Sequence, residues 1–291
     1  MTTALQLLVS GITVGSVYVL LALGWVLVYR VSGLIFLIIG EFAVLGALGA
    51  SELLDSGWST PVAMLGAVVI ALVLAALVDA LLRRLPALGH MQEVLLMIGL
   101  SLLLAELFRR VFGGEVRLFP PFLSTEPLQI GGVSILPHQV LLVVVTGVLA
   151  LLLWLVLQRT LFGRAMSACA ENAVGARVCG ISPRLMRSLA LAIAVAIASL
   201  GGMLLATVQP IAPSSGITLA TAGFIAAALG LWTLPGAIAA GLLVGCLGTF
   251  GAGYVSSAYQ DIFSQGALIV ALVIATLPWT PAVIRRRLDA A

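Results

Sequence analysis

Long apolar stretches, separated by short polar or Gly/Pro-rich breaks, make up almost the whole chain. Several of them reach the roughly 20 residues that a helix needs to cross a bilayer. The apolar runs are continuous and do not alternate with polar positions, which excludes a membrane β-barrel. The pattern therefore predicts an all-α polytopic membrane protein with a single transmembrane domain over residues 1–291. The expected helices cover residues 4–29, 34–54, 62–82, 94–112, 138–157, 189–208, 219–231, 237–250 and 262–278.

Two of these helices, at 219–231 and 237–250, are short for a full crossing. The Thr233–Gly236 break separates them. We expect them to be tilted or to form a broken helix, which is tolerated in a membrane where protein surrounds it. The prediction is therefore about eight or nine transmembrane or broken helices.

Composition limits what the chain can do. Hydrophobic residues make up 62% of it and charged residues only 9%. Arginine supplies all 14 basic residues, so the Gly-Lys-Ser/Thr of a P-loop ATPase is absent. The two histidines, His90 and His138, lie near membrane edges and make neither a catalytic triad nor a metal site. We therefore expect no catalytic residues, no metal and no bound cofactor, and any ATP-driven work must come from a partner.

The positions of the arginines predict the orientation. With the polar loop at 158–187 placed in the cytosol and the spans alternating, eleven arginines fall inside: three at 30, 83 and 84, five in the loop, and three at 285–287. Three fall outside, at 109, 110 and 117. The positive-inside rule then predicts an outer N-terminus, a cytosolic C-terminus and an outer loop at 113–137. Charges at membrane edges favour this explanation over nucleic-acid binding.

The loop at 158–187 is the only long polar interruption in the second half of the chain. Small helix formers dominate Ala165–Val178, Gly180 can end that helix, and Ser182-Pro183 can start the next one. We expect one short helix here, on the cytosolic face of the membrane between two spans.

This loop also carries a family resemblance. The run Ala168–Asn172, followed by Gly180-Ile181 nine residues after Glu171, resembles the EAA-type loop of ABC importer permeases, and most of all the LivH-type permeases for branched-chain amino acids. Asn172 stands where the family usually has Asp, and the run 36–41 lacks the usual polar Asn and His or Gln. Further segments similar to this family lie along the chain at Gly11–Tyr29, Gly40–Phe42, Leu45–Ala47, Ile98–Leu102 and Leu234–Ala237.

The resemblance implies a permease subunit in a bacterial or archaeal inner membrane, which forms half of a path for branched-chain amino acids or related small solutes. It implies a second related permease, ATPase subunits that use ATP and Mg, and an extracytoplasmic substrate-binding protein. The alternative is a self-sufficient channel or secondary transporter. That class needs several buried ionisable residues, for which only Glu41 and Glu106 are good candidates. A third hypothesis is a structural membrane subunit that contains no translocation path.

The candidate site residues fall into three groups. Those expected to contact and couple to the ATPase are Ala170, Glu171, Asn172, Ala173, Gly180 and Ile181. The pathway candidates are Gly40 and Glu41; Glu41 either lines the path near the ammonium group of the solute or ties two helices together as a hydrogen-bonded carboxyl. The receptor-docking candidates, on a loop that otherwise only closes over the bundle, are Glu115, Arg117 and Glu126.

Overall fold

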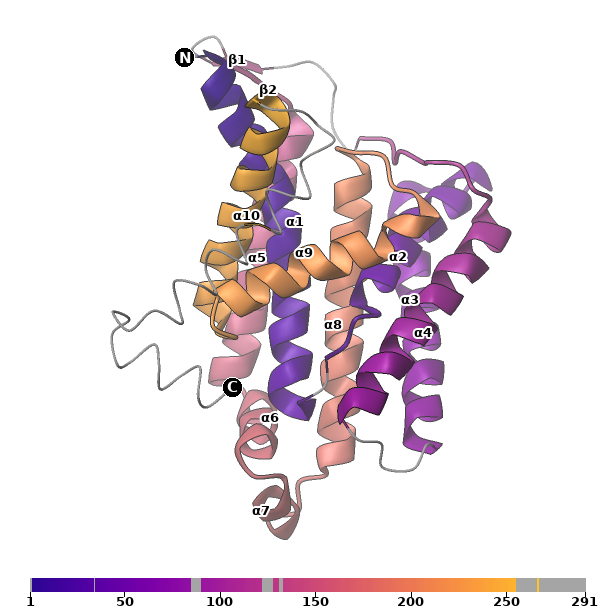
Figure 1. Ribbon diagram of the computed structural model, residues 1–291, viewed down its shortest axis with the longest axis vertical. Coiled ribbons are helices and arrows are strands. Elements are labelled where there is room, and N and C mark those ends of the chain that lie inside the picture. Colours follow the sequence, from indigo (N-terminus) through magenta and orange to yellow (C-terminus); the bar gives the residue numbers. More distant parts are fainter. Residues whose placement is uncertain are drawn as a thin grey trace.

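The computed structural model describes residues 2–33, 35–84, 90–121, 128–130, 133–254 and 266. Within these ranges the chain forms ten α-helices, one 3-10 turn (η1, Pro213–Ser215) and a short antiparallel hairpin of β1 (Leu128–Ile130) and β2 (Val133–Ile135) (Figure 1). The predicted span at 262–278, apart from residue 266, and the arginines at 285–287 lie outside the described residues. The helices are α1 (Thr2–Ser32), α2 (Ile39–Asp55), α3 (Thr60–Arg84), α4 (His90–Phe112), α5 (Pro137–Arg159), α6 (Leu161–Glu171), α7 (Ala173–Val178), α8 (Pro183–Ala206), α9 (Gly216–Leu229) and α10 (Leu234–Tyr254).

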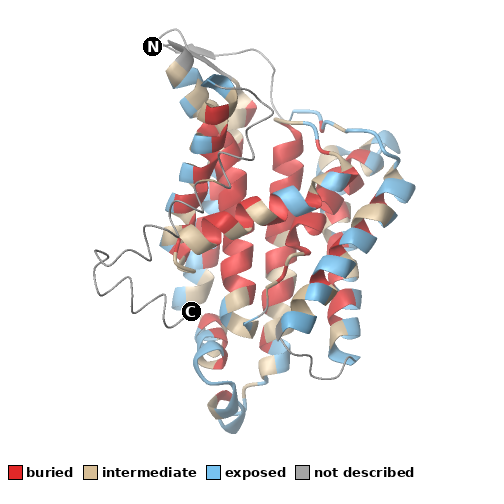
Figure 2. Ribbon diagram, in the orientation of Figure 1, coloured by how far each residue is buried: buried red, intermediate tan, exposed pale blue. Residues whose placement is uncertain are grey.

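Five of the described helices, α1, α3, α5, α8 and α10, are long and apolar enough to cross a membrane. The apolar window of α1 is 94% buried, whereas those of α3 and α5 are 28% and 22% buried. Figure 2 shows the same division, with buried residues along α1 and α8 and exposed residues over α3 and α4. Peripheral helices that expose apolar side chains are what a lipid environment requires. The predicted all-α polytopic membrane architecture is confirmed.

Several predicted helices differ in their bounds, among them α8, which begins at Pro183 and not at residue 189. The second begins at Ile39 and not at residue 34, and α10 is 21 residues long, which exceeds the predicted 237–250. The seventh, α9, has only 14 residues and is as short as predicted. It runs across the long axis of the molecule, whereas α1, α8 and α10 run along it (Figure 1). A turn at 230–233 separates α9 from α10, as the Thr233–Gly236 break predicts.

Close contact between helix backbones holds α2 in the centre of the bundle, against α8 on one side and α9 on another. A Cβ added to Gly202 of α8 would overlap the carbonyl oxygen of Ala43, and one added to Gly40 would overlap the carbonyl oxygen of Gly216. Helices in lipid associate through such small residues, because apolar side chains gain little by leaving the lipid tails. These glycines therefore fix how near α8 and α9 lie to α2.

We predict that Gly202→Ala lowers the stability of the detergent-purified protein by about 1–3 kcal/mol, since its methyl group enters an occupied space. Gly99→Ala is the matched control, because a Cβ at Gly99 meets nothing within 4 Å. The control should be neutral or slightly stabilising. Thermal unfolding of both variants checks this, and equal melting temperatures would show that the α2–α8 contact is not tight.

Candidate coupling, pathway and docking sites

The polar loop folds into two helices, α6 and α7, at the end of the molecule opposite the N-terminus and the hairpin (Figure 1). The prediction of one helix over Ala165–Val178 is wrong. The first helix begins earlier, at Leu161, where the Thr160 hydroxyl accepts a hydrogen bond from the Gly163 amide at 3.1 Å. It ends at Glu171, so residues 165–178 contain the boundary between two helices.

Asn172 causes this break. Its backbone is extended (φ −153°, ψ 96°), and its Oδ1 accepts hydrogen bonds from the amides of Val174 and Gly175 at 3.0 and 2.9 Å. A side-chain oxygen that caps two free amides is the favoured start of a helix, and it competes with continuing the helix before it. The residue that the resemblance places at the coupling site is thus an N-cap.

The exit from α7 is as predicted. Gly180 adopts a left-handed conformation (φ +78°), and its amide donates to the Arg177 carbonyl at 3.0 Å. The Ile181 amide donates to the Ala176 carbonyl at 2.9 Å, which completes a Schellman motif. Pro183 then opens α8 at its first position, and α8 continues without interruption into the membrane span. The turn between α7 and α8 is therefore short and is closed by two backbone hydrogen bonds.

One side of the α6–α7 unit is exposed and the other is buried. Ala170, Glu171, Asn172 and Ala173 are exposed, and Val174 and Val178 expose 70% and 86% of their surface. Met166, Cys169 and Ala176 face the bundle and are buried, and burial raises the pKa of the Cys169 thiol above its ordinary value.

Glu41 lies where α2, α4 and α9 meet. It is fully buried in the first turn of α2, and its Oε1 accepts a hydrogen bond from the Ser101 hydroxyl of α4 at 2.8 Å. Its carboxylate fills the space beside Gly216, the first residue of α9, where a Cβ would overlap it. Negative charge is favourable at a helix N-terminus. Glu41 Oε2 has no hydrogen-bond partner among the described residues.

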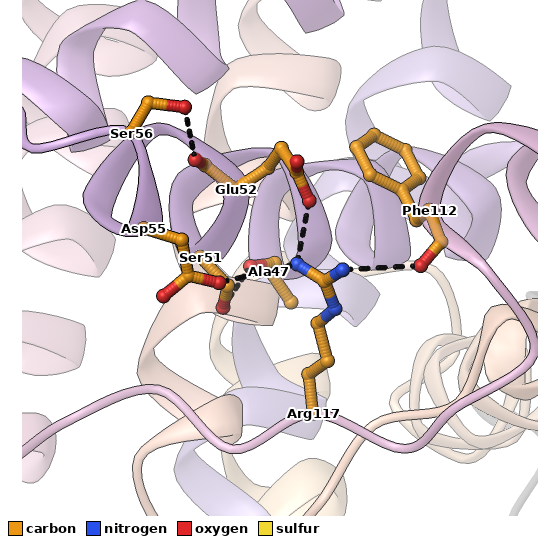
Figure 3. A network of polar contacts seen from close by, with 7 residues as sticks. All are labelled: Ala47, Ser51, Glu52, Asp55, Ser56, Phe112 and Arg117. Atoms are coloured by element: carbon orange, nitrogen blue, oxygen red, sulfur yellow. Dashed lines mark hydrogen bonds and ion pairs between the residues drawn. The ribbon is translucent and has the colours of Figure 1, made fainter.

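Arg117 links the segment that follows α4 to the end of α2 (Figure 3). Its Nη1 lies 2.6 Å from Glu52 Oε2 and 3.5 Å from Asp55 Oδ2, at the end of α2. Its Nη2 donates to the Phe112 carbonyl at 3.2 Å, and its backbone pairs with that of Ile211 in both directions. Only 28% of the Arg117 side chain is exposed, so most of its hydrogen-bonding capacity is used within the chain.

Of the other two docking candidates, the structure describes Glu115 but not Glu126. Glu115 is exposed and lines a surface depression of about 510 Å³ together with Asp55 and Arg117. Glu126 lies outside the described residues.

Comparison with known proteins decides the family. Residues 7–273 match the model of the family described as "Branched-chain amino acid transport system / permease component". This chain belongs to that permease family. The resemblance to LivH-type permeases is thereby confirmed, and the chain is a permease subunit of the ABC-importer type.

Individual relatives cover nearly the full length of this permease. It is 30% identical over 285 residues to the high-affinity branched-chain amino acid transport system permease protein BraD of Pseudomonas aeruginosa, covering 92% of this chain and 93% of the relative. It is 28% identical over 288 residues to LivH of Escherichia coli, covering 93% of each. The solved structure of PsaBC from Streptococcus pneumoniae in complex with Fab matches with a TM-score of 0.51 and 16% identity, over 93% of this chain and 91% of that one, and shows the fold alone.

Sequence reasoning missed the partner of Glu41 in this permease. Ser101 lies in the segment Ile98–Leu102 that resembles the family, and an isolated serine in an apolar span is itself a signal of such a partner. Buried polar groups need hydrogen-bond partners, so an acid in one span and a hydroxyl in another are candidates for pairing.

The Glu41–Ser101 pair can be tested in a double-mutant cycle. Glu41→Ala leaves the Ser101 hydroxyl unpaired and opens a cavity, so we expect a loss of about 2–4 kcal/mol of stability. Ser101→Ala in the same chain should recover part of this, with a coupling energy of about 0.5–3 kcal/mol. Thermal unfolding of the four variants gives this energy.

Ser16→Ala provides the matched control, because Ser16 lies on α1 and bonds only within its own helix, to the Ile12 carbonyl at 2.7 Å. Its effect should add to that of Glu41→Ala. Strict additivity of Ser101→Ala and Glu41→Ala would refute the pairing.

Proposed function

We propose that this permease forms one half of the translocation path of an ATP-driven importer for branched-chain amino acids or related small solutes. ATP and Mg are used by partner ATPase subunits, and this chain binds no cofactor and performs no covalent chemistry. The observation that carries the proposal is the α6–α7 unit, which projects from the bundle, exposes apolar residues at its tip and is fixed at both ends to membrane-spanning helices.

The junctions of the α6–α7 unit with its neighbouring helices would allow it to transmit a displacement. The capping by Thr160 joins α5 to α6, that by Asn172 joins α6 to α7, and the Gly180 turn joins α7 to α8. Since each junction is hydrogen-bonded, displacement of the tip moves α5 and α8 and is not absorbed by slack chain. Val174 and Val178 are the side chains that would bind in an apolar groove of the ATPase subunit.

The charged residues around the α6–α7 unit indicate which side chains the edge of the ATPase groove should carry. Arg159, Arg164, Arg177 and Arg184 are exposed around the unit, against the single acid Glu171. An ATPase groove with an apolar floor and acidic side chains at its edge fits this surface, because guanidinium groups form strong paired hydrogen bonds with carboxylates.

We place the solute path along the open side of α9. Ile217 and Thr218 are exposed, and Thr221 and Phe224 are half-buried, so this face mixes hydroxyl and apolar groups as a path for a branched-chain amino acid requires. Short helices that cross inside a bundle are common at transporter substrate sites. Gly40 and Glu41 then act on the path indirectly, by positioning the N-terminus of α9.

The proposed orientation in the membrane determines where the remaining partners would bind. An outer N-terminus puts α6 and α7 in the cytosol of a bacterial or archaeal cell, and puts Glu115 on the outer face for an extracytoplasmic binding protein. A second, related permease completes the path beside α9. The docking contact is weak and transient on this proposal, because few charges face outward there.

Substitution at the tip tests the proposal. We predict that Glu171→Lys combined with Ala173→Trp lowers co-purification of the cognate ATPase subunits by about tenfold or more, equivalent to about 1.4 kcal/mol. Both residues are exposed, so the membrane fold should stay intact and the variant should elute as one species. Glu93→Lys, a charge reversal on α4 at the same end of the molecule, should leave co-purification unchanged. A fully assembled and active complex carrying both tip substitutions would refute the coupling role.

A further inference from the structure

A cavity of about 260 Å³ lies between α3 and α8, close to the ends of both helices that lie nearest the α6–α7 unit. Most of its wall is apolar and small, and one end is polar. The apolar wall consists of Leu72, Ala75, Ala76, Ala80, Leu191 and Ala192, and the polar end of Asp79, Arg83 and Ser188. Its volume is many times what one water molecule or a bare cation occupies.

The polar end holds a buried charge with unused bonding capacity. Asp79 Oδ2 lies 2.5 Å from the Arg83 guanidinium and accepts a hydrogen bond from the Ser188 hydroxyl at 2.7 Å. The Asp79 side chain is only 7% exposed, and its Oδ1 has no hydrogen-bond partner among the described residues. An ionised carboxylate has about four acceptor positions, so half of this group is left without a donor.

The cavity opens on the face that the bundle presents to lipid. Ala76 and Ala80 at its edge are exposed, and Leu77 and Leu81 beside them expose 63% and 48% of their surface. Arg83 is 50% exposed in the last turn of α3, at the boundary where the apolar helix ends. Acidic and basic groups at this depth face lipid headgroups, while the apolar wall faces acyl chains.

We propose that this cavity binds the headgroup of an amine-bearing phospholipid, phosphatidylethanolamine. Its ammonium group donates to Asp79, its phosphate lies against Arg83, and an acyl chain follows the exposed edge of α3. A zwitterionic headgroup matches a site that contains one negative and one positive side chain.

Other lipids fit the site less well. A phosphatidylcholine headgroup carries no N–H and cannot donate a hydrogen bond to Asp79, and an anionic headgroup without an amine leaves the carboxylate facing a phosphate. The proposed orientation of the permease assigns the lipid to the inner leaflet. The binding itself does not depend on the transport function.

The unmodified full-length chain gives the first test. After exchange into detergent, it is offered phosphatidylethanolamine, its N-methyl and N,N-dimethyl derivatives, phosphatidylcholine and phosphatidylglycerol, and retained lipid is measured by native mass spectrometry. We expect retention to fall stepwise with each methyl group, by about tenfold in total, and water-soluble phosphoethanolamine to compete. Equal retention of phosphatidylethanolamine and phosphatidylcholine would overturn the proposal and leave Asp79 as part of an ion pair only.

Single substitutions test whether the lipid headgroup binds in this cavity. Asp79→Asn should abolish the preference for phosphatidylethanolamine over phosphatidylcholine, whereas Arg83→Gln should weaken retention of every phospholipid tested. Glu93→Gln is the control, an acid on α4 at the same end of the molecule, and should keep the full preference. If Asp79→Asn retains the preference, or if Glu93→Gln loses it, the headgroup binds elsewhere and the cavity is not its site. None of these measurements needs the transport partners, so their failure leaves the proposed function unaffected.

Discussion

The close approach of α2 to α8 and α9 is the constraint on which the rest of the structure depends. Glycines bring the helix backbones into contact, and no side chain intervenes between Gly202 and Ala43 or between Gly40 and Gly216. This approach places the Glu41 carboxylate against the first turn of α9.

The same constraint explains why the chain is suited to convey motion. α8 packs against α1, α2 and α3 in the bundle, and its first turn emerges directly from the Gly180 turn of the α6–α7 unit. Since α2 packs on both α8 and α9, displacement of α8 reaches the helix that we place on the solute path. The route consists of packed backbones and capped junctions, and each of these has a named residue that can be changed.

Most local signals in the sequence were reliable, although the expected single helix over Ala165–Val178 was wrong. The spans at α1, α3, α5 and α8 follow from runs of apolar residues, because hydropathy needs no knowledge of tertiary contacts. The stop at Gly180 and the start at Pro183 were predicted for the same reason, since the conformations that these residues favour are properties of the residues themselves. Asn172 is a local signal too, because asparagine is a favoured N-cap, and the expectation of a single helix did not include it.

Pairings between distant parts of the chain were not predictable in this way. Glu41 and Ser101 are 60 positions apart, and no periodicity relates them. Arg117 was expected on a docking surface, and nothing local indicates that it reaches back to Glu52 and Asp55.

The central claim is that this permease moves solute only when partner ATPases drive it. The most direct measurement is uptake of radiolabelled leucine into proteoliposomes that contain either this chain alone or the chain with its second permease, ATPase subunits and binding protein. The account predicts no accumulation by the chain alone, even under an imposed proton or sodium gradient, and ATP-dependent accumulation by the full assembly. Gradient-driven accumulation, or passive flux, through the chain alone would contradict it and identify a self-sufficient transporter or channel.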